Sequence, residues 1–598
     1  MKNIYRHIGK MLFCVGLPLG SLAGSWTACS DFFDIEPQNF VTLDQFWNEE
    51  NDVVSSIAGC YAGLNSEQNI RRMMAWGEFR SENVQNRGKI DKDNSLQRVL
   101  EEDITPTNAY CDWSFMYNVI NRCNIIIHYA PKVHEIDPAY SEGELAAHIA
   151  EVTAIRSLCY FYLIRTFRDV PYSEEAFIND AQTMDLPQTD FYVVLHHLIN
   201  SLEAVQGDAV VRYPEEGSSQ SAYYQTGRMT QLAIWTMLCE MYLWDKQYDK
   251  CIEYADKVIE YKKAYVKEKN RVAVDYSDYY NYPLYSSRYK GTSYYGYSFT
   301  RNFVENNSLE SIFEVAYEKG NVNAYHNIPV GLFYGGTDLD GYVQPSEYIK
   351  GQVKSSNSTL FNNNKYDGRR YENFLFNSGG EALGINKYVP NYLSGVEVLT
   401  PNTANFYSSA SNIWGSPYSV YAKGNDHISE NASNWIVYRL SDVMLLKAEA
   451  LAWTMKDLEE GEEMSEEDKA KRWSIFQLCN AINKRALYQE SPRDTLVYDN
   501  FKTKSVLLDL VYDEREREFL FEGKRFFDLV RRAMAEGNTD YLRSKASQKS
   551  TELASTIDNF MMRMEAIYWP VSLTEMKANP NLKQNPAYGS GEGNIVKN

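Results

Sequence analysis

Three carboxylates in a short charged run are the first residues of this chain whose spacing could support catalysis. Glu514, Glu518 and Glu522 recur at every fourth position, which would place them on one face of a helix. A pair of carboxylates could act as the acid and the nucleophile of a glycoside hydrolase. Arg515 and Arg517 alternate with them at a spacing that favours ion pairs along one helix. We therefore expect an exposed, ion-paired stripe without catalytic residues, because a hydrolase needs two carboxylates facing each other across a cleft.

Other catalytic and metal-binding chemistry lacks a matching motif. The eight histidines show no metal-binding spacing, and the seven cysteines after residue 29 form no Cys-x-x-Cys pair. No phosphate-binding loop or Gly-x-Ser-x-Gly motif occurs. We expect no metal and no cofactor, and we predict that the cysteines are buried free thiols that behave as small apolar residues. The formal net charge of −20 argues against a nucleic-acid partner.

Cys29 stands where a secretory signal would end. A basic start and an apolar stretch from residue 11 to residue 23 precede it. That apolar stretch is too short to cross a bilayer as a helix. We expect residues 1–28 to be removed and Cys29 to carry acyl chains that anchor the protein to a membrane. Cleavage elsewhere, with Cys29 an ordinary thiol, is the alternative.

Aromatic residues mixed with planar polar residues offer the chemistry that binds sugar rings. One such mixture lies at residues 76–83, a second at residues 405–418, and tyrosines crowd residues 276–297. Core packing is the alternative for each aromatic residue, and we expect it for Phe79. The predicted ligand-binding residues are Trp76, Arg80, Asn83, Tyr282, Tyr295, Asn412, Trp414 and Tyr418.

Helical spacing of apolar residues predicts the elements that would position these groups. Between Leu145 and Ile164 apolar residues occupy two helix faces, so this helix must pack between neighbours. Residues 232–259 form two apolar stripes joined by a turn at 245–247, a unit of about the tetratricopeptide length. Between 264 and 434 the helical periodicity fades, and the abundant tyrosines argue for ordered loops with short strands rather than disorder.

The predicted fold is mainly α, a tetratricopeptide-like helical-repeat scaffold with a loop-rich, partly β insertion that forms a ligand-facing subdomain. The 598 residues are enough for more than one subdomain. The predicted parts are a signal peptide at 1–28, an N-terminal helical scaffold at 29–263, a Tyr-rich irregular subdomain at 264–434, and C-terminal helices at 435–598.

Five segments, in order along the chain, carry a resemblance to a known family. They are Cys-Ser-Asp-Phe-Phe-Asp-Ile-Glu-Pro at 29–37, the helix and its Asp-Val-Pro end at 150–172, Arg-Leu-Ser-Asp-Val at 439–443, the Glu/Arg-rich run at 513–531, and the Asn-Pro repeats at 579–586. Together they resemble the SusD/RagB family, surface lipoproteins of Bacteroidetes. The second segment departs from the family at Ser157 and Arg168, where the family has Ala and Gly.

This resemblance implies glycan binding without catalysis on a tetratricopeptide-like scaffold. It also implies a partner, a SusC-like TonB-dependent outer-membrane transporter, and a lipid-anchored location on the outer face of the outer membrane. The leading function is therefore capture of an oligosaccharide and its delivery to that transporter. Capture of a peptide or glycopeptide is an alternative within the same system, and a surface glycoside hydrolase is an alternative of another class.

Overall fold

The structure is a computed structural model, and the chain divides into two compact units, Met1–Phe46 and Trp47–Asn598. In the first unit only the end is described, with the short helix α1 (Leu43–Phe46). Everything below concerns the second unit. The structure describes residues 43–88, 94–179, 181–214, 225–268, 277–279, 281–287, 297–304, 306–317, 327–335, 341–355, 357–362, 366–376, 382–388, 433–459, 462–487 and 496–589.

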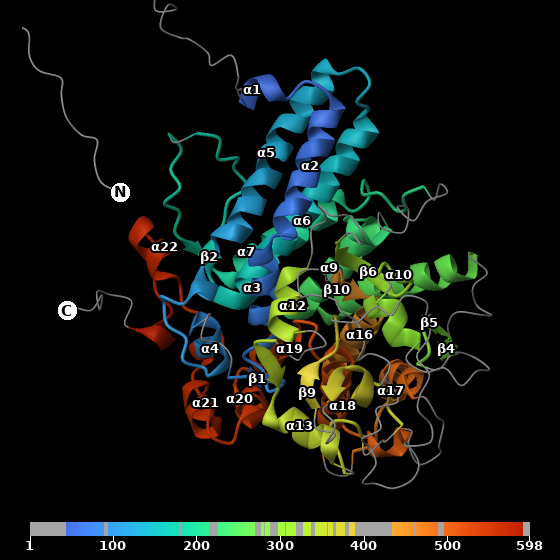
Figure 1. The fold of residues 1–598 in the computed structure, drawn as a ribbon. Helices are drawn as coiled ribbons and strands as arrows, with labels where there is room; N and C mark the ends of the chain where they lie inside the picture. The colour runs from blue at the N-terminus through green and yellow to red at the C-terminus, as the bar shows by residue number, and fades with distance from the viewer. Residues whose placement is uncertain are drawn as a thin grey trace, which may run out of the picture. The chain divides into compact units, whose positions relative to one another are not determined.

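Long helices build the N-terminal part, and α2, α5 and α6 lie side by side (Figure 1). Apolar residues at helical spacing make these helices, and their buried faces meet in one core. The helices are α2 (Glu50–Leu64), α3 (Glu67–Glu78), α4 (Asn94–Leu100), α5 (Ser114–Ile136), α6 (Glu142–Phe167), α7 (Phe191–Val205), α9 (Gln231–Trp244) and α10 (Tyr248–Glu268).

The pair α9 and α10 confirms the predicted helix–turn–helix unit. The two helices pack on each other, and residues 245–247 form the turn between them. α10 packs in turn on α16 (Leu440–Thr454), which lies almost two hundred residues further along the chain. The scaffold is therefore continuous in space although the irregular segment interrupts it in sequence.

α6 confirms the predicted helix that is buried on two faces. Local backbone and side-chain features at each end account for where the helix begins and ends. The Ser141 hydroxyl and the Glu144 carboxylate form a capping box at the N-terminus. At the C-terminus Arg168 has a φ of 67°, a conformation that favours glycine. Its guanidinium contacts the carboxylates of Asp169 and Asp190.

Short antiparallel strands and small helices make up the described parts of the irregular segment. Its strands β6 and β7 pair with strands outside it, so β6 joins β10 and β7 joins β1. The strands are β1 (Val84–Asn86), β2 (Val170–Pro171), β3 (Gln188–Thr189), β4 (Ser277–Tyr279), β5 (Tyr282–Leu284), β6 (Ser311–Val315), β7 (Val343–Pro345), β8 (Phe374–Phe376), β9 (Ala382–Ile385) and β10 (Trp435–Arg439). The helices here are α11 (Tyr297–Phe299), α12 (Ile328–Tyr334), α13 (Glu347–Lys354) and α14 (Arg369–Glu372).

The C-terminal helices return to the same core, which confirms a mainly α fold with a partly β insertion. The seven described cysteines are free and buried, as predicted. No helix in the described part of the chain is long and apolar enough to cross a membrane. Besides α16, the C-terminal helices are α17 (Glu466–Ala486), α18 (Lys504–Phe519), α19 (Arg525–Glu536), α20 (Asp540–Ala546), α21 (Ala554–Phe560) and α22 (Leu573–Ala578).

Candidate functional site

Three of the predicted ligand-binding residues lie in the core, so the prediction is wrong for them. Trp76, Arg80 and Asn83 have no exposed surface. The Trp76 indole donates to a backbone carbonyl at 2.9 Å, and the Arg80 guanidinium pairs with Glu102 at 3.0 Å. The Asn83 amide donates to Glu78 at 2.8 Å. Mixed aromatic and polar composition misled the prediction, because buried polar groups with partners inside the protein have the same composition. Phe79 is buried, as expected.

Tyr282 alone among the remaining candidates lies within the described residues. It sits on β5, half-buried, with the Lys263 ammonium 5.0 Å from the centre of its ring. Its position leaves part of the ring available to a ligand. The others lie outside the described residues, and so does the lipidation site: Tyr295, Asn412, Trp414, Tyr418 and Cys29.

The stripe of glutamates is buried, which corrects the prediction of an exposed helix face. Glu514, Glu518 and Glu522 are each at most 3% exposed. The carboxylate of Glu518 contacts three guanidinium groups, from Arg369, Arg439 and Arg485. Glu514 and Glu518 lie on α18 with the predicted spacing, and Glu514 pairs with Arg517 on the same helix at 2.8 Å. Glu522 lies beyond the end of α18, and the partners of Glu518 and Glu522 come from elsewhere in the fold.

This cluster joins the irregular segment to the scaffold. Arg369 pairs with Glu514 at 2.8 Å, and the Lys387 ammonium pairs with Glu522 at 2.6 Å. Burial alone raises the pKa of Glu518, but the charges of its three arginine partners outweigh burial and hold that pKa well below its ordinary value. A carboxylate locked in this way is neither a proton donor nor free to attack a sugar. The cluster is structural.

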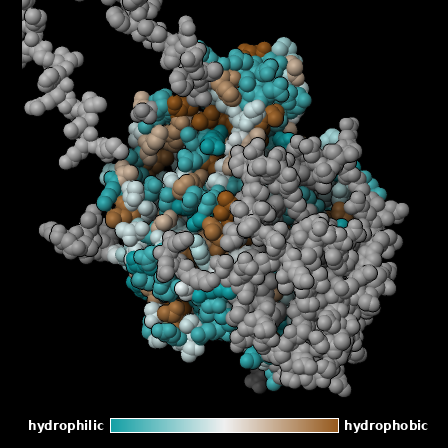
Figure 2. All heavy atoms as spheres, in the orientation of Figure 1, coloured by the Kyte–Doolittle hydropathy of each residue, from teal (hydrophilic) through white to brown (hydrophobic). Residues whose placement is uncertain are grey.

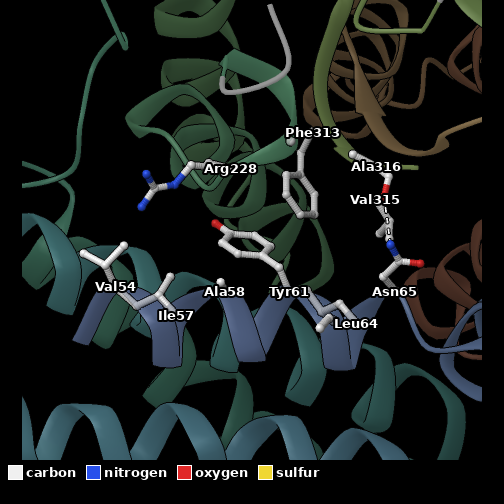
Figure 3. A pocket seen from close by; sticks show the side chains of 12 residues that line it. Val54, Ile57, Ala58, Tyr61, Leu64, Asn65, Arg228, Phe313, Val315 and Ala316 are labelled. Carbon is white, nitrogen blue, oxygen red and sulfur yellow. Dashed lines mark hydrogen bonds between the residues drawn. The ribbon is translucent and has the colours of Figure 1, made fainter. Parts of the chain in front are cut away.

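A pocket of about 340 Å³ lies between α2 and β6, and we call it the α2–β6 pocket (Figure 3). Its volume is in the range of small-ligand sites. Figure 3 shows Tyr61 and Phe313 among its lining residues, with Asn65 at one end and Arg228 at the other. The lining residues are Val54, Ile57, Ala58, Tyr61, Ala62, Leu64, Asn65, Gly227, Arg228, Phe313, Val315 and Ala316.

Helix α2 and strand β6 form opposite walls of this pocket for reasons visible in the sequence. Ile57 and Leu64 are one face of an amphipathic helix and give the pocket an apolar floor. Phe313 and Val315 come from the buried strand β6, which β10 holds in place. Ala58 and Ala62 are exposed on α2, and their small side chains leave the mouth open.

One end of the pocket carries a fixed polar group. Arg228 forms a double contact with the Glu151 carboxylate, at 2.8 Å and 2.5 Å. The Tyr61 hydroxyl donates to the same carboxylate at 2.6 Å and accepts from the backbone of Met229 at 2.7 Å. Burial and the Glu151 charge both raise the pKa of Tyr61. The hydroxyl is therefore a neutral hydrogen-bonding group, and Arg228 remains partly exposed to solvent.

The other end carries the side-chain amide of Asn65. The Asn65 amide donates to the carbonyl of Ala316 at 2.8 Å. Its Oδ1 atom is buried and has no hydrogen-bond partner among the described residues. An apolar floor with aromatic rings and a few polar groups at its ends suits a sugar ring, whose faces are apolar and whose edge carries hydroxyls.

Sequence reasoning did not find this pocket. Tyr61 has helical spacing to Ile57 and Leu64, so its sequence context indicates core packing. Arg228 and Phe313 are brought to Tyr61 only by folding, from positions far along the chain. No local signal in the sequence joins the three.

A second exposed aromatic group lies on α17. Trp473 is 45% exposed, and its ring stacks on Phe476 at 5.8 Å. Tyr498 meets it edge to face at 5.2 Å, and the Arg472 guanidinium lies 3.8 Å from the Tyr498 ring. Figure 2 shows that the described part of the face it draws is mostly hydrophilic, with small hydrophobic patches.

Comparison with known proteins points to one family. The model of the SusD family matches residues 309–588. SusD-like protein P38 of Formosa agariphila is 23% identical over 97% of this chain and 99% of its own length. SusD-like protein P25 of the same organism is 21% identical over 94% of this chain and 96% of its own length.

Solved structures share the fold across almost the whole chain. A SusD superfamily protein from Bacteroides vulgatus is 16% identical with a TM-score of 0.60, covering 91% of this chain and 100% of its own. A structure described as a laminarin binding SusD-like protein is 18% identical with a TM-score of 0.57, and it covers the same shares of the two chains.

Proposed function

We propose, because the chain belongs to the SusD/RagB family, that it captures an oligosaccharide at the cell surface and delivers it to a SusC-like TonB-dependent transporter in the outer membrane. In this proposal it binds its ligand without reacting with it. The observation that carries the proposal is the fold shared over 91% of the chain with a laminarin binding SusD-like protein.

The α2–β6 pocket supports glycan capture at the level of residues. The partly exposed Tyr61 ring would pack against the C–H face of a sugar above the apolar floor, with the Asn65 amide at one end. Arg228 and Tyr61 would bound the other end, where their mutual contact with Glu151 fixes them before ligand arrives. A preformed site loses little side-chain entropy on binding.

Further contacts are proposed from the residues that sequence analysis selected. Trp414, with Asn412 and Tyr418, would add an aromatic platform and amide groups, and Tyr282 and Tyr295 would extend it. An indole face stacks well on a flat ring, and stacking contacts of this type contribute about 1–3 kcal/mol in nucleic-acid complexes. A longer oligosaccharide would then span several such contacts.

The first experiment asks which ligand is bound. A glycan array with the chain from residue 30 onward should give oligosaccharide hits, and isothermal titration should measure their affinity. The same titration with peptides tests the peptide alternative. Intact oligosaccharide after prolonged incubation supports binding without catalysis, whereas released shorter sugars would favour a hydrolase.

The second experiment asks whether the pocket holds the ligand. Ala58→Phe places a ring at the mouth of the pocket, and Ser55→Phe places the same ring on the exposed side of the same helix. We expect a loss of affinity of tenfold or more for Ala58→Phe alone, with equal melting temperatures for the two variants. Unchanged affinity in Ala58→Phe would move the ligand out of the pocket.

Two tryptophan variants separate the proposed platform from other exposed aromatic surface. Trp414→Ala should weaken glycan binding about tenfold, in line with the loss of one stacking contact. Trp473→Ala removes an exposed tryptophan that lies outside the pocket, and it should leave affinity unchanged. A lower melting temperature with full affinity in Trp414→Ala would place that residue in the core.

The membrane anchor is tested at Cys29. In cells that lack the transporter, Cys29→Ala should move the protein from the membrane to the soluble fraction, because acyl chains on this residue are the proposed attachment. Co-purification of the transporter with the unaltered protein tests the partner. Membrane retention of the Cys29→Ala protein would argue against lipidation.

A further inference from the structure

Two pairs of cysteines meet in the core of the helical scaffold. Cys60 on α2 and Cys123 on α5 have their sulfur atoms 3.7 Å apart. Cys239 on α9 and Cys251 on α10 have theirs 3.6 Å apart. Each pair connects two helices that pack directly on each other. The sulfur atoms of each pair are therefore in contact but not bonded, because the two sulfur atoms of a disulfide are about 2.0 Å apart.

The remaining described cysteines provide an internal contrast. Cys111 contacts a backbone carbonyl at 3.6 Å, and no sulfur–sulfur contact is found for it, Cys159 or Cys479 within the described residues. All of these thiols are as deeply buried as the paired ones. Burial therefore does not distinguish the two groups of cysteines, whereas pairing does.

We propose that the two pairs, which are free thiols in this structure, are oxidised when the protein is exported, so that disulfides Cys60–Cys123 and Cys239–Cys251 join α2 to α5 and α9 to α10. This inference rests on the surface location given under the proposed function. In each step the two thiols lose two protons and two electrons, one sulfur–sulfur bond forms, and a disulfide of the exporting compartment is reduced to two thiols. The reaction proceeds by thiol–disulfide exchange through a mixed disulfide. Exported proteins meet such oxidants, whereas cytosolic proteins do not.

The four sulfur atoms are inaccessible in the folded protein, so oxidation has to occur while the chain folds. Their side chains have no exposed surface. Burial also raises the pKa values of Cys123 and Cys239, which keeps the folded thiols protonated and unreactive. Formation during folding then leaves each disulfide enclosed, where it resists reduction.

Counting free thiols in the protein tests this proposal without any substitution. The chain from residue 30 onward, which has seven cysteines, is exported from cells behind a cleavable signal, quenched in acid, unfolded, and alkylated before and after reduction. Intact mass gives the number of alkyl groups. We expect three groups before reduction, on Cys111, Cys159 and Cys479, and seven after it. Seven groups before reduction would overturn the proposal, and five would overturn one of the two pairs, which a peptide map identifies.

The same chain refolded from the reduced, unfolded state with oxidised glutathione provides a second measurement. It should also reach three free thiols, while refolding with reduced glutathione should leave seven. Cys60→Ser should show four free thiols because Cys123 loses its partner. The matched control Cys479→Ser, also a buried cysteine, should show two. Seven free thiols after oxidative refolding would contradict the proposal that the two cysteine pairs form disulfides.

Discussion

The bundle around α6 and the ionic cluster around Glu518 are both buried, but different interactions stabilise them. In α6 the buried side chains are largely apolar, as at Leu158, Phe161 and Leu163, and their contribution follows from removing apolar surface from water. Around Glu518 the buried side chains are charged, and three arginines surround one carboxylate. Each charge there depends on the others, because a buried charge without a partner is strongly destabilising.

The difference teaches how each region tolerates change. An apolar core loses stability in proportion to the volume removed, and neighbouring residues partly relax into the space. A buried ionic cluster cannot relax in this way, since loss of one carboxylate leaves several cations unpaired. The cluster also joins α18 to Arg369 of the irregular segment, so its failure would remove a contact between that segment and the scaffold.

Removing Glu518 should have the largest effect on stability. Glu518→Ala leaves the guanidinium groups of Arg369, Arg439 and Arg485 without their shared carboxylate, and we expect a loss of about 4 kcal/mol in the free energy of unfolding. Urea unfolding followed by circular dichroism measures it. An unfolding midpoint equal to that of the unaltered protein would show that the cluster is not stabilising.

Truncating the apolar bundle should cost somewhat less. Leu158 has no exposed surface, and Leu158→Ala should lower the free energy of unfolding by about 3 kcal/mol through lost burial and the remaining cavity. The same urea titration applies. If this variant proved more destabilised than Glu518→Ala, the apolar bundle and not the ionic cluster would be the more fragile region.

A single buried carboxylate next to the cluster should make stability depend on pH. Burial raises the pKa of Glu78 from 4.5 to about 7, although Asn83 and the backbone of Phe521 and Gly523 donate to it. The folded protein therefore holds this proton more tightly than the unfolded chain. The stability that Glu78 contributes through this proton is fully present below pH 4.5 and is lost as pH rises through 7. The free energy of unfolding should therefore fall by about 2 kcal/mol between pH 5 and 7.

Glu78→Gln isolates this contribution because the amide does not titrate in that range. The difference in unfolding free energy between the variant and the unaltered protein should change by about 2 kcal/mol from pH 5 to pH 7 and level off above pH 8. Urea unfolding in a series of buffers measures the difference. A constant difference would mean that Glu78 keeps one charge state throughout.

The smallest effect is expected for an exposed pair on α17. Glu467 contacts Lys471 at 2.8 Å one helical turn away, with 78% of the glutamate side chain exposed. Glu467→Gln should leave the urea midpoint almost unchanged, because water screens the pair and both side chains are free to move. A marked loss of stability would show that exposed pairs in this protein behave like those around Glu518.

Helix periodicity predicted much of the fold and little of the site. The helix at α6, the turn between α9 and α10, and the mainly α class followed from apolar spacing, because a helix must bury its apolar face wherever it lies. Glu514 and Glu518 share a helix, as predicted, but they are buried, and Glu522 lies past the end of that helix. Trp76 failed as a ligand residue because composition does not distinguish a binding surface from a core with paired polar groups.

The sequence by itself determined where the long helices lie and which family the chain resembles. Helix positions depend on neighbours within one or two helical turns, and the resemblance depends on short motifs that follow one another along the chain. Tertiary structure alone decided that Tyr61, Phe313 and Arg228 share one pocket and that Glu518 meets three arginines. Those contacts join residues far apart in sequence, and only the packing of α2, β6, α17 and α18 into one core brings them within a few ångströms.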